Sequence, residues 1–220
     1  MKTRTAASMF ACVCIAACSY GRGTFPITFD GPPAQPRGTA ALVTNYYESG
    51  MSFTPIISTD RNSAFVRQGG GVSFYPDDGT TYLQAGLGST LMFSFTNGSV
   101  FDLVSVYLAE YSTVVPYAVT VPFIGYRSDG STVTNSFTTD GIIDGTGPLA
   151  DFQTFYFDSQ FTSLTRVEIP TSGWSLDNLS VSVPEPTIGA LLVAGAVTLN
   201  ALRLRNRKGV RKGVKVFGPF

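Results

Sequence analysis

The fold class follows from one stretch, AVTVPFIGYRSDGSTVTNSFT at residues 118–138. Apolar, aromatic and β-branched residues dominate both of its halves, which is the composition typical of β-strands. The dipeptide Asp129-Gly130 separates the halves and accepts the positive φ values of a tight type I′ turn. Residues 118–126 and 132–138 are therefore expected to pair as an antiparallel hairpin.

The same pattern continues on both sides of this hairpin. Short runs of apolar, aromatic and Thr/Ser residues alternate with Gly, Asp, Pro and Asn from residue 20 to residue 183, without long helical periodicity. Residues 35–46 and 69–71 are predicted loops. Strands at this spacing predict an all-β fold, a two-sheet β-sandwich of jelly-roll type. The predicted strands are 25–29, 50–54, 72–75, 81–84, 90–96, 100–109, 118–126, 132–138, 152–157, 165–169 and 175–183.

Composition excludes several kinds of site. The sequence contains no histidine, which excludes a Ser-His-Asp triad, a Cys-His pair and the usual zinc sites. The predicted sandwich, residues 20–183, carries six Lys and Arg against 14 Asp and Glu, a net charge of −8. An acidic domain disfavours nucleic acid as a partner and suits calcium or neutral glycans better.

Residues 1–19 have the layout of a signal peptide. Lys2 and Arg4 form a positive start, and an apolar stretch with small residues follows them. All three cysteines of the chain lie in or at the edge of this leader, so the exported domain is expected to have no disulfide. The sequence IAAC at residues 15–18 also looks like a lipobox. Two outcomes stay open: lipidation of Cys18, or ordinary cleavage near residues 18–20.

A second targeting element begins where the predicted sandwich ends. Pro184-Glu185-Pro186 comes first, and its prolines hold Glu185 on an extended segment that is poor in backbone donors. An apolar run follows at residues 187–204, which as a helix would reach roughly 27 Å, close to a hydrocarbon core of about 30 Å. A single C-terminal transmembrane helix is therefore predicted, with a buried core helix as the alternative. Basic residues after the helix stay in the cytoplasm and set its orientation; they are Arg203, Arg205, Arg207 and Lys208.

The order Pro-Glu-Pro, short apolar helix and Arg-rich end resembles the PEP-CTERM sorting signal of Gram-negative bacteria. The resemblance covers residues 184–208, and residues 209–220 then form a predicted cytoplasmic tail. It implies that Pro184, Glu185 and Pro186 are recognised by an exosortase, a membrane-embedded transpeptidase-like enzyme linked to exopolysaccharide production. It also implies a protein anchored first in the inner membrane and placed at the cell surface or outside the cell after processing.

Acidic residues at both ends of the predicted sandwich suggest a calcium site. Asp30 follows the first predicted strand, and Asp177 and Asn178 lie in the last one. This pairing resembles exported jelly-roll modules, many of them carbohydrate-binding, in which neighbouring first and last strands share a structural calcium. The resemblance implies that these three side chains contribute oxygen ligands to one Ca²⁺. The alternative is that Asp30 opens a turn with Gly31 and that the other two residues only flank a strand.

Two further patterns bear on function. Glu48, Glu110 and Glu168 are candidates for the paired carboxylates of a glycoside hydrolase, although their spacing does not show whether two of them face each other across a cleft. Aromatic residues are candidates either for a sugar-stacking surface or for core packing; they are Tyr46, Tyr47, Tyr75, Tyr82, Tyr111, Tyr117 and Trp174. The sequence thus predicts a surface or matrix protein that is structural or adhesive and not an enzyme. The alternatives are a module that binds exopolysaccharide or other surface glycans, and a carbohydrate-active enzyme.

Overall fold

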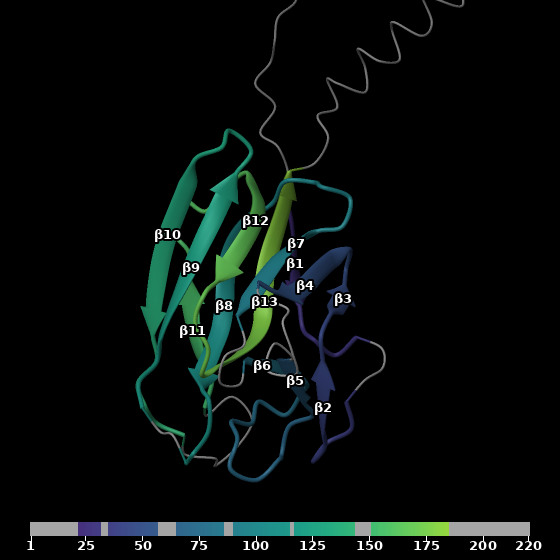
Figure 1. The fold of residues 1–220 in the computed structure, drawn as a ribbon, viewed down its shortest axis with the longest axis vertical. Helices are drawn as coiled ribbons and strands as arrows, with labels where there is room; N and C mark the ends of the chain where they lie inside the picture. The colour runs from purple at the N-terminus through teal and green to yellow at the C-terminus, as the bar shows by residue number, and fades with distance from the viewer. Residues whose placement is uncertain are drawn as a thin grey trace, which may run out of the picture. The chain divides into compact units, whose positions relative to one another are not determined.

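The computed structural model describes residues 22–31, 35–56, 65–85, 90–114, 117–143 and 151–184. These residues belong to one compact unit, Arg22–Pro184. Their strands form two antiparallel sheets that pack face to face around a common core (Figure 1). The prediction of an all-β, two-sheet sandwich is therefore confirmed.

The first sheet contains seven strands. They are β1 (Arg22–Ile27), β2 (Ala40–Val43), β5 (Phe65–Gln68), β6 (Tyr82–Ala85), β8 (Asp102–Glu110), β11 (Gln153–Tyr156) and β13 (Trp174–Pro184). Their order is β11-β8-β13-β6-β5-β2, and β1 pairs with β13 beside this row. The long strand β13 is the centre of the sheet, because it pairs with β1, β6 and β8.

The second sheet contains six strands in the order β10-β9-β12-β7-β4-β3. They are β3 (Tyr46–Glu48), β4 (Met51–Pro55), β7 (Leu91–Phe95), β9 (Thr120–Arg127), β10 (Thr132–Thr138) and β12 (Leu164–Ile169). The predicted hairpin is β9 and β10, whose register runs without a shift from Thr132 opposite Tyr126 to Thr138 opposite Thr120.

The turn of this hairpin differs from the predicted type I′ turn. Only Gly130 has a positive φ, 86°, whereas a type I′ turn also needs a positive φ at Asp129. The Arg127 N–H donates to the Ser131 carbonyl over 2.9 Å, so three residues form the loop. Ser131 N–H and Oγ both donate to the Asp129 carboxylate, over 2.8 and 2.7 Å. Asp129 therefore stabilises the turn through its side chain, and Gly130 adopts the left-handed conformation.

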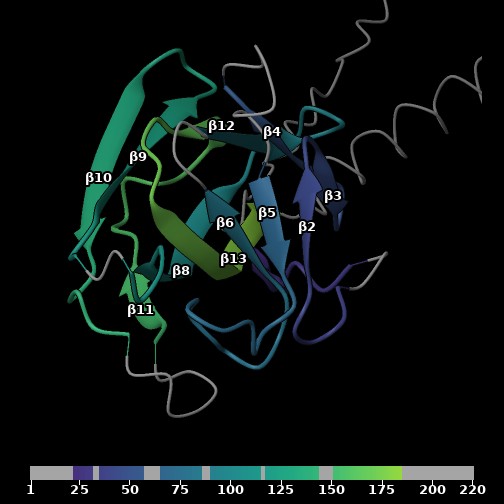
Figure 2. The same ribbon diagram turned by 60° about the horizontal axis from the view of Figure 1, so that its bottom comes forward.

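From β6 onwards the strands wind around the core from one sheet to the other (Figure 2). Strands β6, β8, β11 and β13 belong to the first sheet, and β7, β9, β10 and β12 to the second. Neighbours in space follow β6-β13-β8-β11 in one sheet and β7-β12-β9-β10 in the other. Only β9 and β10 are consecutive strands that stay in the same sheet within this part of the chain.

The core is built from alternate side chains of both sheets and is rich in phenylalanine. Phe53 and Phe93 stack with ring centroids 5.4 Å apart, and Phe29 meets Phe53 edge to face at 5.1 Å. A Cβ atom on Gly125 would lie 2.8 Å from Leu164 Cδ2. The Leu164 and Val133 side chains pack directly over this glycine, so a larger residue would have to displace them.

Other parts of the predicted strand pattern need correction. Residues 72–75 form a turn and not a strand, because Gly70, Gly71 and Phe74 have positive φ values of 66°, 62° and 73°. The predicted loop at residues 35–46 contains β2 and the first residue of β3. Strand β5 is absent from the prediction because it contains Arg67 and Gln68, which are polar and nevertheless buried.

Candidate functional site

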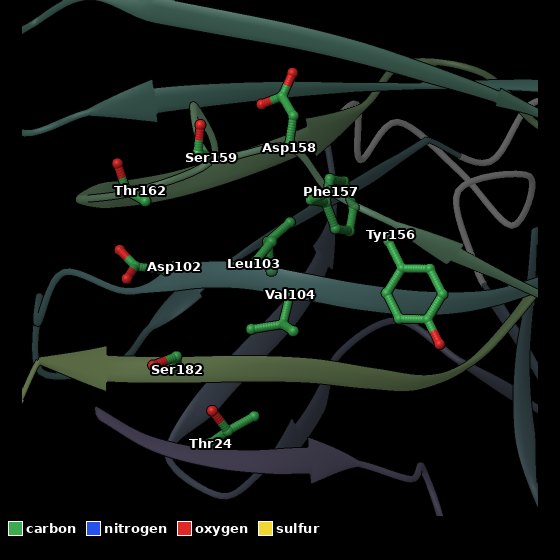
Figure 3. Close-up of a pocket in the computed structure, with 10 residues that line it drawn as sticks. All are labelled: Thr24, Asp102, Leu103, Val104, Tyr156, Phe157, Asp158, Ser159, Thr162 and Ser182. Carbon is green, nitrogen blue, oxygen red and sulfur yellow. The ribbon is translucent and has the colours of Figure 1, made fainter. Parts of the chain in front are cut away.

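An open groove lies on the first sheet, over β1, β13 and β8, beside the segment that follows β11 (Figure 3). Its volume is about 350 Å³, within the range of small-ligand sites. The lining residues carry hydroxyl, carboxylate and aromatic groups; they are Thr24, Asp102, Leu103, Val104, Tyr156, Phe157, Asp158, Ser159, Thr162 and Ser182.

One end of the groove is a row of polar side chains on three neighbouring strands. The register places Ser182 opposite both Thr24 and Asp102. Ser182 and Asp102 are buried, each 3% exposed, and form the floor of the row. The Asp102 Oδ1 atom accepts a hydrogen bond from the Ser163 N–H over 2.8 Å. This bond fixes the loop before β12 against the groove.

Tyr156 lies at the other end of the groove, with Val104 between it and Asp102 (Figure 3). The Tyr156 side chain is 71% exposed. Its neighbours in sequence, Phe155 and Phe157, both pack on Phe137, with ring centroids 5.0 and 5.1 Å away. Because side chains alternate along an extended segment, inward packing of the two phenylalanines directs Tyr156 outward.

The segment after β11 forms the wall of the groove. The Phe157 N–H donates to the Val104 carbonyl over 3.0 Å, so the backbone beyond Tyr156 is held on β8. Asp158 accepts the Gln160 N–H with Oδ1 over 2.8 Å, which shapes a turn and keeps the carboxylate at the rim. An exposed aromatic ring beside carboxylates and hydroxyls can bind a ligand with an apolar face and many hydroxyl groups.

A second polar feature is a cluster of three carboxylates, Asp30, Asp78 and Asp177, which we call the carboxylate cluster. Asp177 is fully buried on β13, Asp78 is 4% exposed on the loop before β6, and Asp30 is exposed just after β1. Thr80 Oγ lies 3.0 Å from Asp78 Oδ1 and 3.3 Å from Asp177 Oδ2. Asp30 accepts the neighbouring Thr81 N–H over 2.9 Å.

Burial makes a charge on Asp177 costly. Desolvation, and then the nearby Asp78 carboxyl, raise the pKa of Asp177 to about 11. The Asp78 and Asp177 carboxyl groups lie within hydrogen-bond reach of each other, and apart from this mutual contact Asp177 Oδ1 and Asp78 Oδ2 have no partner among the described residues. Such a pair of carboxylates requires either a bound proton or a cation.

Asn178, the next residue after Asp177, donates from its Nδ2 to Asp177 Oδ2 over 2.7 Å and has a φ of 44°. Asp30 contributes to the raised pKa of Asp177 through its negative charge. Among the described residues, no three His, Cys, Asp or Glu side chains converge to hold an ion by themselves. An ion here would need two carboxylates, Asp78 and Asp177, completed by hydroxyl and carbonyl oxygens, which are ligands that calcium accepts.

Comparisons with known proteins give only distant likenesses. No family model matches the sequence, and no curated protein matches it. One similar structure is the family 11 carbohydrate-binding module from Clostridium thermocellum in complex with a β-1,3-1,4-mixed-linked tetrasaccharide. The two are 13% identical with a TM-score of 0.30, over 74% of this chain and 96% of that one. Another is the CBM22-1–GH10 part of the xylanase 10B from the same organism with xylohexaose, 10% identical with a TM-score of 0.28, over 74% of this chain and 28% of that one.

The aromatic residues singled out from the sequence separate into core and surface. Tyr46, Tyr82 and Trp174 are buried, with 4%, 0% and 0% of their surface exposed, so they cannot form a sugar-stacking surface. Tyr47 and Tyr117 are 61% and 70% exposed, but neither lines the groove. Tyr75 and Tyr111 pack edge to face, 5.9 Å apart.

Tyr156 is absent from the sequence prediction, as is Asp78. The alternation in Gln153-Thr154-Phe155-Tyr156 indicates an outward Tyr156 once the two-faced strand is recognised. Asp78 belongs to an Asp-Asp-Gly-Thr turn, and no local pattern relates that turn to β13.

The three candidate catalytic glutamates all have structural partners. Glu48 accepts the Thr28 and Phe29 N–H groups over 3.0 and 2.8 Å. Glu110 is buried and accepts the Gly141 N–H over 2.7 Å. Glu168 accepts the Tyr126 hydroxyl over 2.8 Å and pairs with Arg166 at 3.2 Å. They lie on β3, β8 and β12, and no two of these strands pair with each other.

Most of the predicted targeting residues lie outside the described part of the chain. This applies to the signal peptide with Cys18, to Glu185 and Pro186, and to the apolar run with its basic cluster. Pro184 is described: it is the exposed last residue of β13 and pairs with Arg22. Nowhere in the described segments does a helix occur that is long and apolar enough to cross a membrane.

Proposed function

We propose that this chain is an exported, membrane-anchored surface protein whose jelly-roll sandwich binds a glycan in the groove, without catalysis. One arrangement carries the glycan proposal: the exposed ring of Tyr156 shares one open groove with carboxylates and hydroxyls. A sugar has an apolar C–H face that packs on an aromatic ring, and hydroxyls that donate to carboxylates. A surface protein that holds a polysaccharide in this way has an adhesive role.

The strand order supports the jelly-roll assignment. Two rows, β6-β13-β8-β11 and β7-β12-β9-β10, arise when a long hairpin of strands wraps around a core as two Greek keys. Strands β1 to β5 then extend the two sheets. The net charge of −8 over residues 20–183 favours a neutral glycan over a polyanion as the ligand.

The structural roles of the glutamates argue against these three residues as a catalytic pair. A glycosidase needs two carboxyl groups that face each other across the scissile bond. Glu48, Glu110 and Glu168 are instead committed to backbone N–H groups, Tyr126 and Arg166 on separate strands. Purified protein is accordingly expected to bind polysaccharide and to release no sugar from it.

Replacing Tyr156 by alanine should weaken glycan binding about tenfold, because a lost stacking contact of about 1.4 kcal/mol corresponds to that factor. Affinity electrophoresis in gels containing the exopolysaccharide of the producing cells, or a mixed-linkage β-glucan, measures the effect. Tyr117→Ala is the matched control, because Tyr117 is 70% exposed and Tyr156 is 71% exposed. Equal retardation of both variants, or no retardation of the parent in any gel, would contradict glycan binding in this groove.

We propose further that Pro184, Glu185 and Pro186 form the motif read by an exosortase, and that the apolar run and Arg203, Arg205, Arg207 and Lys208 anchor and orient the precursor. The support is the order of these elements in the sequence. The fold adds that the sandwich reaches up to Pro184 through β13. The motif thus begins at the last residue of β13, which pairs with Arg22.

Replacing Pro184 and Pro186 together by alanine should stop C-terminal processing, because the backbone is no longer fixed in an extended form. Uncleaved precursor should accumulate, and intact-mass analysis of the protein from the native cells measures it. Pro170→Ala is the control, since Pro170 is an exposed proline between β12 and β13. If the double variant is processed as completely as the parent, after correction for the mass of the two substitutions, the motif is not what directs processing.

We also infer that the carboxylate cluster holds one structural calcium ion. Asp78 and Asp177 would supply carboxylate oxygens, Thr80 a hydroxyl oxygen, and Asp30 additional negative charge. Asn178 would hold the Asp177 carboxylate in position through its amide. Support comes from the two buried carboxyl groups that lie within hydrogen-bond reach of each other, because a cation between them would replace the proton that they otherwise share.

A further inference from the structure

The free edge of β10 is the most open sheet edge in the described part of the chain, and we propose that it pairs with the β10 edge of a second copy of this chain. Strand β10 ends the second sheet, and among the described strands only β9 pairs with it. Both ribbon views show β10 at the margin of the sandwich, with no coloured strand beyond it (Figures 1 and 2).

The other sheet margins are short or protected. Strands β2, β11 and β3 have four, four and three residues, whereas β10 has seven. Strand β1 contains Pro26. Charges, prolines, bulges and short length are the usual devices that keep sheet edges from pairing. Strand β10 has no charged residue, no proline and no shift in register along β9.

The backbone groups on the free edge can be identified from the ladder with β9. Ser136 lies opposite Pro122, which has no N–H to donate. The Ser136 N–H donates to the Asn135 side chain over 2.8 Å and not to β9. Because alternate residues of an antiparallel strand face alternate sides, residues 132, 134, 136 and 138 direct their N–H and C=O groups to the free edge.

The sequence of β10 is complementary to itself. A two-fold axis beside Asn135 places Thr134 opposite Ser136 of the second copy, and Val133 opposite Phe137. Hydroxyl residues then meet hydroxyl residues and apolar residues meet apolar residues, as an interface between identical surfaces requires; the strand reads TVTNSFT. Pairing in this register forms roughly eight backbone hydrogen bonds between the copies and brings no like charges together within the ladder.

Two features around β10 should regulate the association. The Asn135 amide competes for the Ser136 N–H, so the bond within one copy must open before pairing. Beyond the ends of the ladder, the two-fold axis brings Asp129 of one copy towards Asp140 of the other, and both residues are exposed. Salt screens this repulsion, so the association should tighten as ionic strength rises.

Disulfide trapping in the full-length chain tests the proposal, with Cys12, Cys14 and Cys18 replaced by serine. Asn135→Cys places one thiol of each copy at the two-fold axis, within the distance that a disulfide spans. Thr134→Cys is the matched control, because Thr134 is more exposed than Asn135. In the proposed dimer, however, the two Thr134 positions lie more than about 7 Å apart across the two-fold axis, too far for a disulfide. Oxidation of the purified chain in detergent should cross-link the residue-135 variant about tenfold faster than the residue-134 variant. Similar rates, or faster cross-linking at residue 134, would mean random collision and overturn the proposal.

A second substitution tests whether backbone pairing holds the two copies together. Ser136→Pro removes an N–H that the ladder with β9 does not use, so each copy should keep its fold. Added to Asn135→Cys, it should abolish the rapid cross-linking, whereas Ser136→Ala should leave it unchanged. Circular dichroism of each variant checks the fold. Rapid cross-linking in a folded proline variant would exclude the β10 edge as the interface.

Discussion

Calcium should raise the melting temperature of the segment 22–184 by about 5–10 °C. An ion that binds only the folded state stabilises it by mass action, by about 2.7 kcal/mol at 100 times the dissociation constant. A domain of this size gains roughly 2–4 °C for each kcal/mol. Thermal unfolding followed by circular dichroism, in excess calcium and in chelator, measures the difference.

In chelator, the free energy of unfolding of the segment 22–184 should decrease as pH rises. The pKa of Asp177 is about 11 in the folded protein, against about 3.9 for an unperturbed aspartate. The folded state therefore binds more protons than the unfolded state between these values, and stability falls as pH rises from about 4. A paired surface carboxylate would have the opposite effect. Calcium should prevent most of this loss of stability, because the bound ion neutralises Asp177 in place of the proton.

The substitution Asp177→Asn separates calcium binding from the cost of the buried charge. It removes a charge but keeps the shape of the side chain, so it should raise the melting temperature in chelator and abolish the response to calcium. Asp158→Asn is the control, because Asp158 is an exposed carboxylate outside the cluster. If the melting temperature of the parent segment is the same in calcium and in chelator, Asp177 is a protonated core residue that binds no ion.

Replacing Trp174 by alanine should destabilise the segment 22–184 by about 3–5 kcal/mol, the usual cost of deleting a large buried aromatic side chain. Trp174 is fully buried at the start of β13, where it pairs with Ala85 on one side and Glu110 on the other. Its Nε1–H donates to the Thr171 carbonyl over 2.8 Å. Alanine would leave a cavity between the sheets and a carbonyl without this donor.

Urea unfolding followed by circular dichroism measures this loss. Trp174→Phe should cost less, because the ring still fills most of the cavity, and Tyr117→Ala should change stability by less than about 0.5 kcal/mol. The parent chain provides an independent signal, since Trp174 is its only tryptophan and its fluorescence reports unfolding of the core. A loss below 1 kcal/mol for the alanine variant would show that Trp174 is not part of a packed core.

The fold class was predictable because most of its strands carry their own signals. The β9–β10 hairpin shows both the alternation of side chains and an Asp-Gly turn, and β10 spans the predicted residues 132–138. Strand β5 shows the limit of such signals. Arg67 is 2% exposed, and its guanidinium donates to the carbonyls of Phe29 and Gly31 and lies over the Tyr46 ring. A buried arginine looks like a surface residue until its partners, far away in sequence, are known.

The candidate sites were predictable to a smaller extent for the same reason. Asp177 and Asp30 could be related in advance because a resemblance suggested that first and last strands are neighbours, and β1 does pair with β13. Asp78 reaches the cluster from a loop between β5 and β6. Nothing in its local sequence indicates burial at 4% exposure. The groove likewise combines residues of four strands and a loop, a combination that depends on the winding of the whole sandwich.

The position of β13 also determines how this domain would carry a mechanical load. Arg22 and Pro184 form the last pair of the β1–β13 ladder, so tension between these two residues would open that ladder like a zipper, one pair at a time. Ser182, in the floor of the groove, lies only two residues from Pro184 on β13. Tension between a bound ligand and Pro184 would therefore load only this end of the sheet, where Ser182 pairs with Thr24 and Asp102. Resistance to force depends on the rate of unfolding, so a protein that is held at its C-terminal end and pulled through its groove would keep most of the sandwich out of the path of the load.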